Sequence, residues 1–232
     1  MIEEPAKLTI KKPSRRPTAA QIAAFQGVPT GFVVDAMDGY GALSPAIRPL
    51  GEGRDLKCVA AGPALTCASG PADILGTLAA LKFIQPGDIV VNAFEGFQGC
   101  AACGDRLIGM MKNNGAAGFV TDGPMRDYQG IVDVGLAAWC TGLNPNSPVA
   151  SGPGRVGLPI PVGGMEVETG DMIVADTDGV VVVPFEGIAQ VVERLERIVE
   201  LETALDKEVA DGLKLPDAIA ELLESDQTRM ID

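Results

Sequence analysis

An arginine and an aspartate stand side by side in the segment VTDGPMRDYQG, residues 120–130. Arg126 and Asp127 come one turn after Asp122-Gly123-Pro124, which ends an apolar run with the composition of a buried strand. One interpretation of this pair is a solvated ion pair at the start of a helix. The other is a site in which the carboxylate holds a cation and the guanidinium binds an anionic substrate oxygen. The choice depends on what the fold places beside the pair.

A second carboxylate, Asp105, is predicted to lie near this pair. It opens a helix expected over residues 106–113, and the strand 118–121 follows that helix. In a strand–helix–strand unit, the start of the helix and the end of the next strand lie at the same edge of the sheet. Asp105, Arg126 and Asp127 can therefore converge, although Asp105 alone would ordinarily be a helix N-cap.

The chemistry open to such a site is limited, because the chain contains no histidine. Catalytic triads, Cys-His nucleophiles and imidazole-bound zinc are excluded. Carboxylates, arginines, backbone amides and a hard cation such as Mg²⁺ or Mn²⁺ remain. The N–H groups of Arg106 and Leu107 at the helix start could hold a carboxylate. This set suits a divalent cation that holds a 2-oxo acid.

A third carboxylate of interest, Glu202, lies in a long amphipathic helix predicted over residues 187–211. At 100° per residue it falls within the apolar stripe, about 20° from Leu195. A carboxylate on a buried face is costly unless it is paired or bound. Two interpretations remain open: the helix end turns into solvent, or Glu202 points into a site, which can belong to a neighbouring subunit.

The composition indicates a single α/β domain with terminal extensions. Apolar residues make up 47% of the 232, whereas 29 glycines and 17 prolines indicate many short strands and tight turns. The net charge of −13 argues against binding to nucleic acid or to anionic lipid. Because the chain has neither a long apolar segment nor a signal-peptide pattern, we expect no membrane association and a cytoplasmic location.

Five cysteines, an odd number, fit free thiols in a reducing compartment. Cys100 and Cys103 form a CxxC pair, which could be redox-active or half of a zinc site. The chain has no second CxxC, so small core-facing residues near a turn are the favoured interpretation.

We divide the chain into an N-terminal arm (1–17) without regular structure, one α/β domain (18–186) and a C-terminal helical segment (187–232). The last would pack on the domain or on a neighbouring subunit. Alternating strands and helices in the middle, with hairpins on both sides, predict a layered domain with mixed sheets. A short helix is expected to open at 17–21 with Thr18 as its cap, and further helices at 29–37, 72–83 and 126–134. Strands are expected at 56–62, 63–68, 89–93, 161–167, 172–175 and 180–183.

The run from Gly104-Asp105 to Arg126-Asp127 resembles the RraA-like family. That family includes the 4-hydroxy-4-methyl-2-oxoglutarate/4-carboxy-4-hydroxy-2-oxoadipate aldolases and the regulator of ribonuclease activity A. The likeness covers roughly residues 28–212. It includes the segments Val34–Met37, Ile47–Leu50, Ala61–Thr66, Pro86–Val91 and Ala175–Pro184, in family order.

The resemblance implies a β/β/α swivelling-type sandwich that forms trimers or hexamers, with sites between subunits. In the aldolase branch, the match of Asp127 binds Mg²⁺ or Mn²⁺ and the match of Asp105 acts through water. The match of Arg126 contacts the substrate, and the amides matching Arg106 and Leu107 hold the pyruvyl carboxylate. A glutamate from the partner's C-terminal helix, here aligned with Glu202, completes the metal shell.

One departure concerns the distal part of the substrate. Aldolases of the family often carry a Lys or Arg near residues 137–141, where this chain has Trp139 and Thr141. We predict a class II (metal-dependent) pyruvate aldolase that cleaves a 4-hydroxy-2-oxo acid, with oxaloacetate decarboxylation as a side activity. A water held by Asp105 and Glu202 would relay the proton from the 4-hydroxyl. The alternative is a non-catalytic, protein-binding regulator of the RNase-inhibitor type.

Overall fold

One long strand, β3 (Ala60–Ala68), connects the two parts of the fold in the computed structural model, which describes residues 6–231. Its first half pairs antiparallel with β10 (Met172–Ala175), and its second half pairs parallel with β4 (Ile89–Ala93). The sequence predicts two strands here, separated at Pro63. The chain instead continues as one strand, because Pro63 stands where β3 changes partners and its missing N–H costs little.

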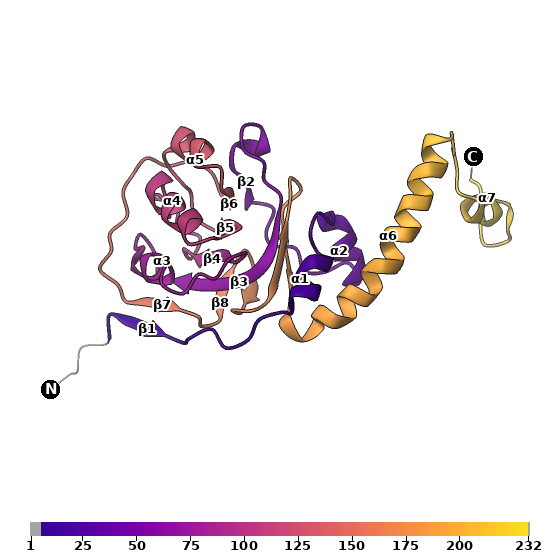
Figure 1. The fold of residues 1–232 in the computed structure, drawn as a ribbon. Helices are drawn as coiled ribbons and strands as arrows, with labels where there is room; N and C mark the ends of the chain where they lie inside the picture. Colours follow the sequence, from indigo (N-terminus) through magenta and orange to yellow (C-terminus); the bar gives the residue numbers. More distant parts are fainter. Residues whose placement is uncertain (1–5, 232) are drawn as a thin grey trace.

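The parallel part of the sheet carries three helices on one face (Figure 1). Strands β3, β4, β5 (Gly118–Thr121) and β6 (Ala137–Cys140) run parallel in this order. Their connections contain α3 (Leu75–Ala80), α4 (Asp105–Asn113) and α5 (Tyr128–Val134). The carboxyl ends of these strands and the N-termini of the helices that follow them therefore meet at one edge. The remaining strands on this side are β1 (Leu8–Ile10), β2 (Arg48–Pro49), β7 (Gly154–Val156), β8 (Ile160–Val162) and β9 (Met165–Val167).

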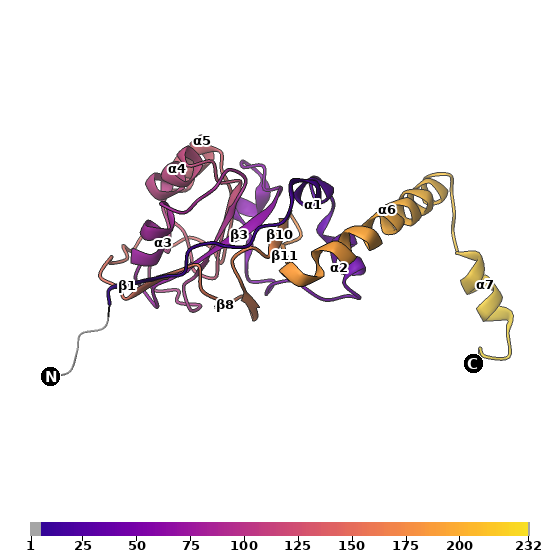
Figure 2. The same cartoon turned by 60° about the horizontal axis from the view of Figure 1, so that its bottom comes forward.

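A second hydrophobic core lies around the hairpin of β10 and β11 (Val180–Val183), which turns at Asp178-Gly179 as predicted. The helices α1 (Ala19–Ala24), α2 (Thr30–Ala36) and α6 (Ile188–Ala210) pack against this hairpin (Figures 1 and 2). The layered α/β sandwich with mixed sheets and a long C-terminal helix is thereby confirmed. Two short 3₁₀ helices complete the described elements, at Leu50–Gly53 and Phe185–Gly187.

The N-terminal arm is more ordered than the sequence predicts. Its residues Leu8–Ile10 form β1, which pairs in parallel with β7. Arg15 then donates to Glu168 at 2.7 Å and to Asp171 at 3.3 Å, and Arg16 pairs with the buried Asp88. These contacts hold the arm along the domain. The prolines that suggested irregular structure lie outside the three residues that form the strand.

The C-terminal segment leaves the body of the domain (Figures 1 and 2). The first half of α6 buries Ile188, Val191 and Leu195, whereas Leu201 and Leu205 in its second half are exposed. A further helix, α7, covers Asp217–Glu224 and buries none of its residues in this chain. In the described part of the chain, no helix combines the length and the apolar character needed to cross a membrane.

Candidate active site

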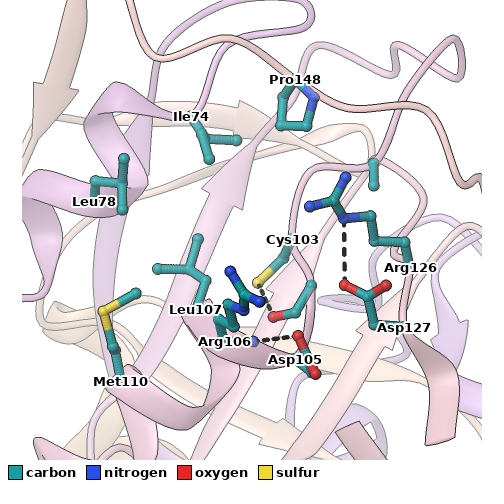
Figure 3. Close-up of a pocket in the computed structure, with 12 residues that line it drawn as sticks. Ile74, Leu78, Cys103, Asp105, Arg106, Leu107, Met110, Arg126, Asp127 and Pro148 are labelled. Atoms are coloured by element: carbon teal, nitrogen blue, oxygen red, sulfur yellow. Dashed lines mark hydrogen bonds and ion pairs between the residues drawn. The ribbon is translucent and has the colours of Figure 1, made fainter. Parts of the chain in front are cut away.

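A pocket of about 430 Å³ opens at the N-terminal end of α4, beside the loop that precedes α5 (Figure 3). Five of the six residues proposed from the sequence line it; Glu202 does not. The lining residues are Ile74, Leu78, Ala101, Cys103, Gly104, Asp105, Arg106, Leu107, Met110, Arg126, Asp127 and Pro148.

Two loops that run side by side bring the acidic residues together. The N–H of Ala102 donates to the Pro124 carbonyl at 2.7 Å, and the N–H of Arg126 donates to the Cys103 carbonyl at 3.0 Å. These bonds fix the turn before α4 against the turn after β5. Asp105 follows directly in the chain and consequently shares a pocket with Arg126, as the strand–helix–strand argument predicts.

Asp105 is the first residue of α4, and Gly104 rather than Asp105 is its N-cap. The Asp105 Oδ1 accepts the N–H of Arg106 at 2.6 Å. In the described part of the chain, the next amide, that of Leu107, has no hydrogen-bond acceptor. Of the two amides proposed to hold a carboxylate, Leu107 N–H is therefore open, and Arg106 N–H is open only if Asp105 releases it.

Asp127 has a left-handed backbone, with φ 59° and ψ 46°, and it is the N-cap of α5. The predicted helix over residues 126–134 therefore begins only at Tyr128. An aspartate at this position ordinarily accepts from the amides of the first helical turn, but the side chain of Asp127 makes no capping bond and is 43% exposed. The carboxylate is directed into the pocket instead (Figure 3). A strained backbone of this kind is often found at functional sites.

Arg126 is held from two sides. Its Nε lies 3.3 Å from Asp127 Oδ2, and its Nη1 donates to Ser147 Oγ at 2.6 Å. A guanidinium has five N–H donors, so these contacts leave donors for a ligand. The pair lines a pocket that also contains Asp105, and this placement favours a binding role over a simple solvated bridge.

Two glycines allow the loops and helices around the aspartates to approach closely. A Cβ at Gly104 would lie 2.5 Å from Asp127 Oδ2, and a Cβ at Gly130 would lie 2.5 Å from Asp105 Oδ2.

Both carboxylates are oxygen donors of the kind that Mg²⁺ and Mn²⁺ prefer, and Mg²⁺ is commonly held by one or two carboxylates together with waters. The donor set therefore fits such a cation. Within residues 6–231, no group of three acidic or cysteine side chains is arranged to hold a metal ion.

Glu202 lies on α6, and its side chain is only partly buried. Helix α6 leaves the domain on the side away from α4 and α5 (Figure 1). The structure thus does not bring Glu202 to the pocket of its own chain. Its role in the pocket of a neighbouring subunit stays a prediction.

The sequence leaves open which residues receive the distal part of the substrate, because Trp139 and Thr141 stand where related aldolases often have a Lys or Arg. Trp139 is fully buried and donates to the carbonyl of Asp176, and Thr141 donates to Gln98. Neither lines this pocket. Ile74, Leu78 and Met110 line the side away from Arg126 instead, and Pro148 lies at the rim near Arg126 (Figure 3). No local pattern in the sequence indicates that these four residues meet, since they come from α3, α4 and two loops that are brought together by the tertiary fold.

All five cysteines are free and buried. Cys103 lines the pocket, and burial raises the pKa of its thiol, as it does for Cys67, whose pKa rises to about 12. Thiols of this kind stay protonated at neutral pH and are poor nucleophiles. They agree with the interpretation of Cys100 and Cys103 as small core-facing residues.

Comparison with known proteins places this geometry in a family. The family model described as "RraA-like: Aldolase/RraA" matches residues 30–182. A protein of Halalkalibacterium halodurans named "Putative 4-hydroxy-4-methyl-2-oxoglutarate aldolase" is 32% identical over 192 residues, 83% of this chain and 90% of that protein.

Solved structures agree with this result. Streptomyces coelicolor RraAS2, described as an unusual member of the RNase ES inhibitor RraA protein family, has a TM-score of 0.71 at 28% identity. The match covers 83% of this chain and all of that one. An uncharacterized protein from Pseudomonas syringae pv. tomato has a TM-score of 0.73 at 22% identity over 87% of this chain and 97% of that one, which supports the fold alone.

Proposed function

The chain belongs to the RraA-like family, and from this premise we propose that it is a divalent-metal-dependent lyase. It would cleave a 4-hydroxy-2-oxo acid, such as 4-hydroxy-4-methyl-2-oxoglutarate, to pyruvate and a second carbonyl compound. One observation carries the proposal: Asp105, Arg126 and Asp127 line a single pocket at the N-terminus of α4. A regulator that acts only through its surface does not need this arrangement.

Asp127 and Asp105 would hold Mg²⁺ or Mn²⁺, Asp105 through water. When bound, the cation would supply Lewis-acid stabilisation of the charge that develops on the 2-oxo oxygen. The Leu107 amide at the start of α4 would bind the carboxylate of the pyruvyl group, with the Arg106 amide beside it. Among the described residues, the Leu107 amide has no hydrogen-bond acceptor, whereas the Arg106 amide donates to Asp105.

Arg126 would donate to the 2-oxo oxygen as the enolate forms, because its contacts with Asp127 and Ser147 leave further N–H groups. The proton of the 4-hydroxyl must leave before the carbon–carbon bond breaks. In the absence of histidine, a water held by Asp105 and by Glu202 of the partner subunit would take it. The half-buried position of Glu202 on an otherwise exposed stretch of α6 supports this assignment.

Pyruvate release tests the reaction directly. The protein is assayed with a panel of 4-hydroxy-2-oxo acids and with oxaloacetate, whose decarboxylation passes through the same enolate. We expect pyruvate from both kinds of substrate with Mg²⁺ or Mn²⁺, and none after treatment with EDTA. Activity that persists in EDTA would contradict the metal-dependent reaction.

A complementation experiment tests the partner's contribution. Asp127→Asn and Glu202→Gln should each be inactive alone, whereas oligomers assembled from both variants would contain intact sites that combine Asp127 of one subunit with Glu202 of the other. We expect part of the activity to return on co-expression, and light scattering to show a homotrimer or homohexamer. A clean monomer would remove Glu202 from the site.

The similarity to RraAS2 favours one alternative, a protein-binding regulator of the RNase-inhibitor type. Such a regulator has no need of a cation at Asp127. Calorimetric titration with Mg²⁺ separates the two functions: binding that is lost in Asp127→Asn supports the lyase, and no binding at millimolar Mg²⁺ supports the regulator.

A further inference from the structure

One wall of the pocket consists only of apolar side chains and faces the polar groups (Figure 3). Ile74 precedes α3 and Leu78 lies within it, while Leu107 and Met110 are three residues apart on one face of α4. Pro148 lies at the rim. Leu107 is 6% exposed and Met110 39% exposed, so part of this apolar wall is accessible to a ligand.

The charged groups of the pocket lie elsewhere. Among the described residues that line it, the cations are Arg106 and Arg126. Arg126 is tied to Asp127 and Ser147 at the polar side. Arg106 stands in the first turn of α4 next to Asp105, and it is exposed. Figure 3 shows Arg106 beside Leu107, whereas Ile74, Leu78 and Met110 carry no charge. A carboxylate seated on the apolar wall would therefore lose its hydration with Arg106 as its nearest cation, and this arginine is exposed rather than held in place by an ion pair among the described residues.

On the basis of the function proposed above, we infer that the preferred substrate carries an uncharged alkyl or aryl group at C4, in place of the C4 carboxylate of 4-hydroxy-4-methyl-2-oxoglutarate, and that this group binds to the apolar wall. The volume of about 430 Å³ is within the usual range of ligand pockets, about 300–1,000 Å³, and leaves room beyond a pyruvyl group. The polar side would then hold the pyruvyl end, and the wall would set the specificity for the other product.

The reaction needs no further reagent. The 4-hydroxyl loses its proton, the C3–C4 bond breaks, and C4 becomes the carbonyl carbon of an apolar aldehyde or ketone. The electron pair of the broken bond forms the pyruvate enolate, which takes up a proton at C3. Both products therefore arise without oxidation or reduction.

Two matched substrate series test the inference. The first has unbranched alkyl groups of increasing length at C4, beginning with 4-hydroxy-2-oxohexanoate. The second ends in a carboxylate at equal chain length, such as 4-hydroxy-2-oxoadipate. We expect kcat/KM for pyruvate release to rise about fourfold per added methylene, which corresponds to about 0.8 kcal/mol per CH₂. The alkyl member of each matched pair should exceed the acid by about tenfold or more.

Three variants locate the selectivity. Met110→Lys puts a cation on the wall and should lower the alkyl-to-acid ratio of kcat/KM by about tenfold. Val59→Lys changes an exposed apolar residue outside the pocket and should leave the ratio unaltered. Arg106→Ala tests the competing possibility that this exposed arginine binds a distal carboxylate.

Calorimetric binding of 2-oxohexanoate and 2-oxoadipate with Mg²⁺ gives a readout that does not need turnover. Tighter binding of 2-oxohexanoate without any pyruvate release would support the wall's selectivity and overturn the lyase reaction. Decarboxylation of oxaloacetate together with a preference for the acid series, lost in Arg106→Ala, would overturn the inference and leave the lyase intact. If no substrate reacts and neither 2-oxohexanoate nor 2-oxoadipate binds, the proposed lyase reaction and the inferred selectivity of the wall are both refuted.

Discussion

Gly130→Ala offers a sharp test of whether the position of Asp105 matters for activity. Gly130 lies inside α5, so alanine suits its backbone and raises helix propensity by about 1 kcal/mol. The new Cβ, however, would lie 2.5 Å from Asp105 Oδ2 and 2.7 Å from Asp105 Cβ, where ordinary contact begins at 3.4 Å. Rotation of the carboxylate cannot relieve the second contact. The start of α4 must therefore move away from α5, by roughly 0.7 Å if this contact is to reach 3.4 Å.

A displacement of about 1 Å in a catalytic group can lower activity about 10²-fold. We expect kcat/KM for pyruvate release to fall by that factor. The free energy of unfolding should change by less than about 2 kcal/mol, because the helix-propensity gain offsets part of the overpacking. Gly109→Ala, inside α4, is the matched control: its Cβ meets only a Val134 methyl, at 3.8 Å. It should be fully active, and stabilised by up to about 1 kcal/mol. A fully active Gly130→Ala enzyme would refute the placement of Asp105 in the site.

Three further predictions follow from named contacts. Asp127→Asn is nearly isosteric and removes the charge of a proposed metal ligand, so it should abolish Mg²⁺-dependent pyruvate release and leave the melting curve unchanged. Normal Mg²⁺ dependence in this variant would show that another residue is the ligand. Arg126→Lys keeps the charge but loses the planar, forked geometry of the guanidinium, so turnover should fall about 10²-fold while the Mg²⁺ affinity measured by calorimetry stays the same. An unchanged turnover number would show that the Arg126–Asp127 pair has only a structural role. Arg16→Gln removes the cation beside the buried Asp88, whose pKa is raised by burial and lowered by Arg16. Because burial raises the pKa of Asp88 in the folded state, the charged carboxylate lowers stability as the pH rises through that pKa, and Arg16 offsets this loss only where Asp88 is charged. In urea unfolding, the deficit of Arg16→Gln should therefore be about 2–3 kcal/mol at pH 7 and shrink towards pH 4, where protonated Asp88 no longer needs the cation. An equal deficit at both pH values would contradict the charge pairing.

Local patterns in the sequence predict the regular elements well. The helix predicted over 187–211 spans Ile188–Ala210, and the hairpin turn at Asp178-Gly179 lies between β10 and β11. Thr18 caps α1 through a capping box with Gln21, as its type and position indicate. These features depend on residues close in the chain, so periodicity and capping chemistry are sufficient to find them.

The convergence of Asp105 with Arg126 and Asp127 was also predictable, because the strand–helix–strand rule holds for any such unit. The local geometry of the site could not be predicted in the same way. The left-handed backbone of Asp127 and the close approach of Gly130 to Asp105 depend on how two loops pack. The apolar wall depends on where α3 lies across the pocket. Neither arrangement leaves a periodic signal in the sequence.

The exposed face of α6 and the presence of only two carboxylates among the described residues that line the pocket are two separate observations that one assembly would explain. Leu201 and Leu205 leave an apolar surface without cover in the single chain, and Glu202 lies between them. The pocket supplies two carboxylates and, in the described residues, no third. If α6 packs across the pocket of a neighbouring subunit, the same contact would bury the leucines and bring a third carboxylate to the proposed metal site. The cost of holding Glu202 among apolar side chains would then be offset at the metal site of the neighbour, and assembly would be a condition for activity rather than an addition to it.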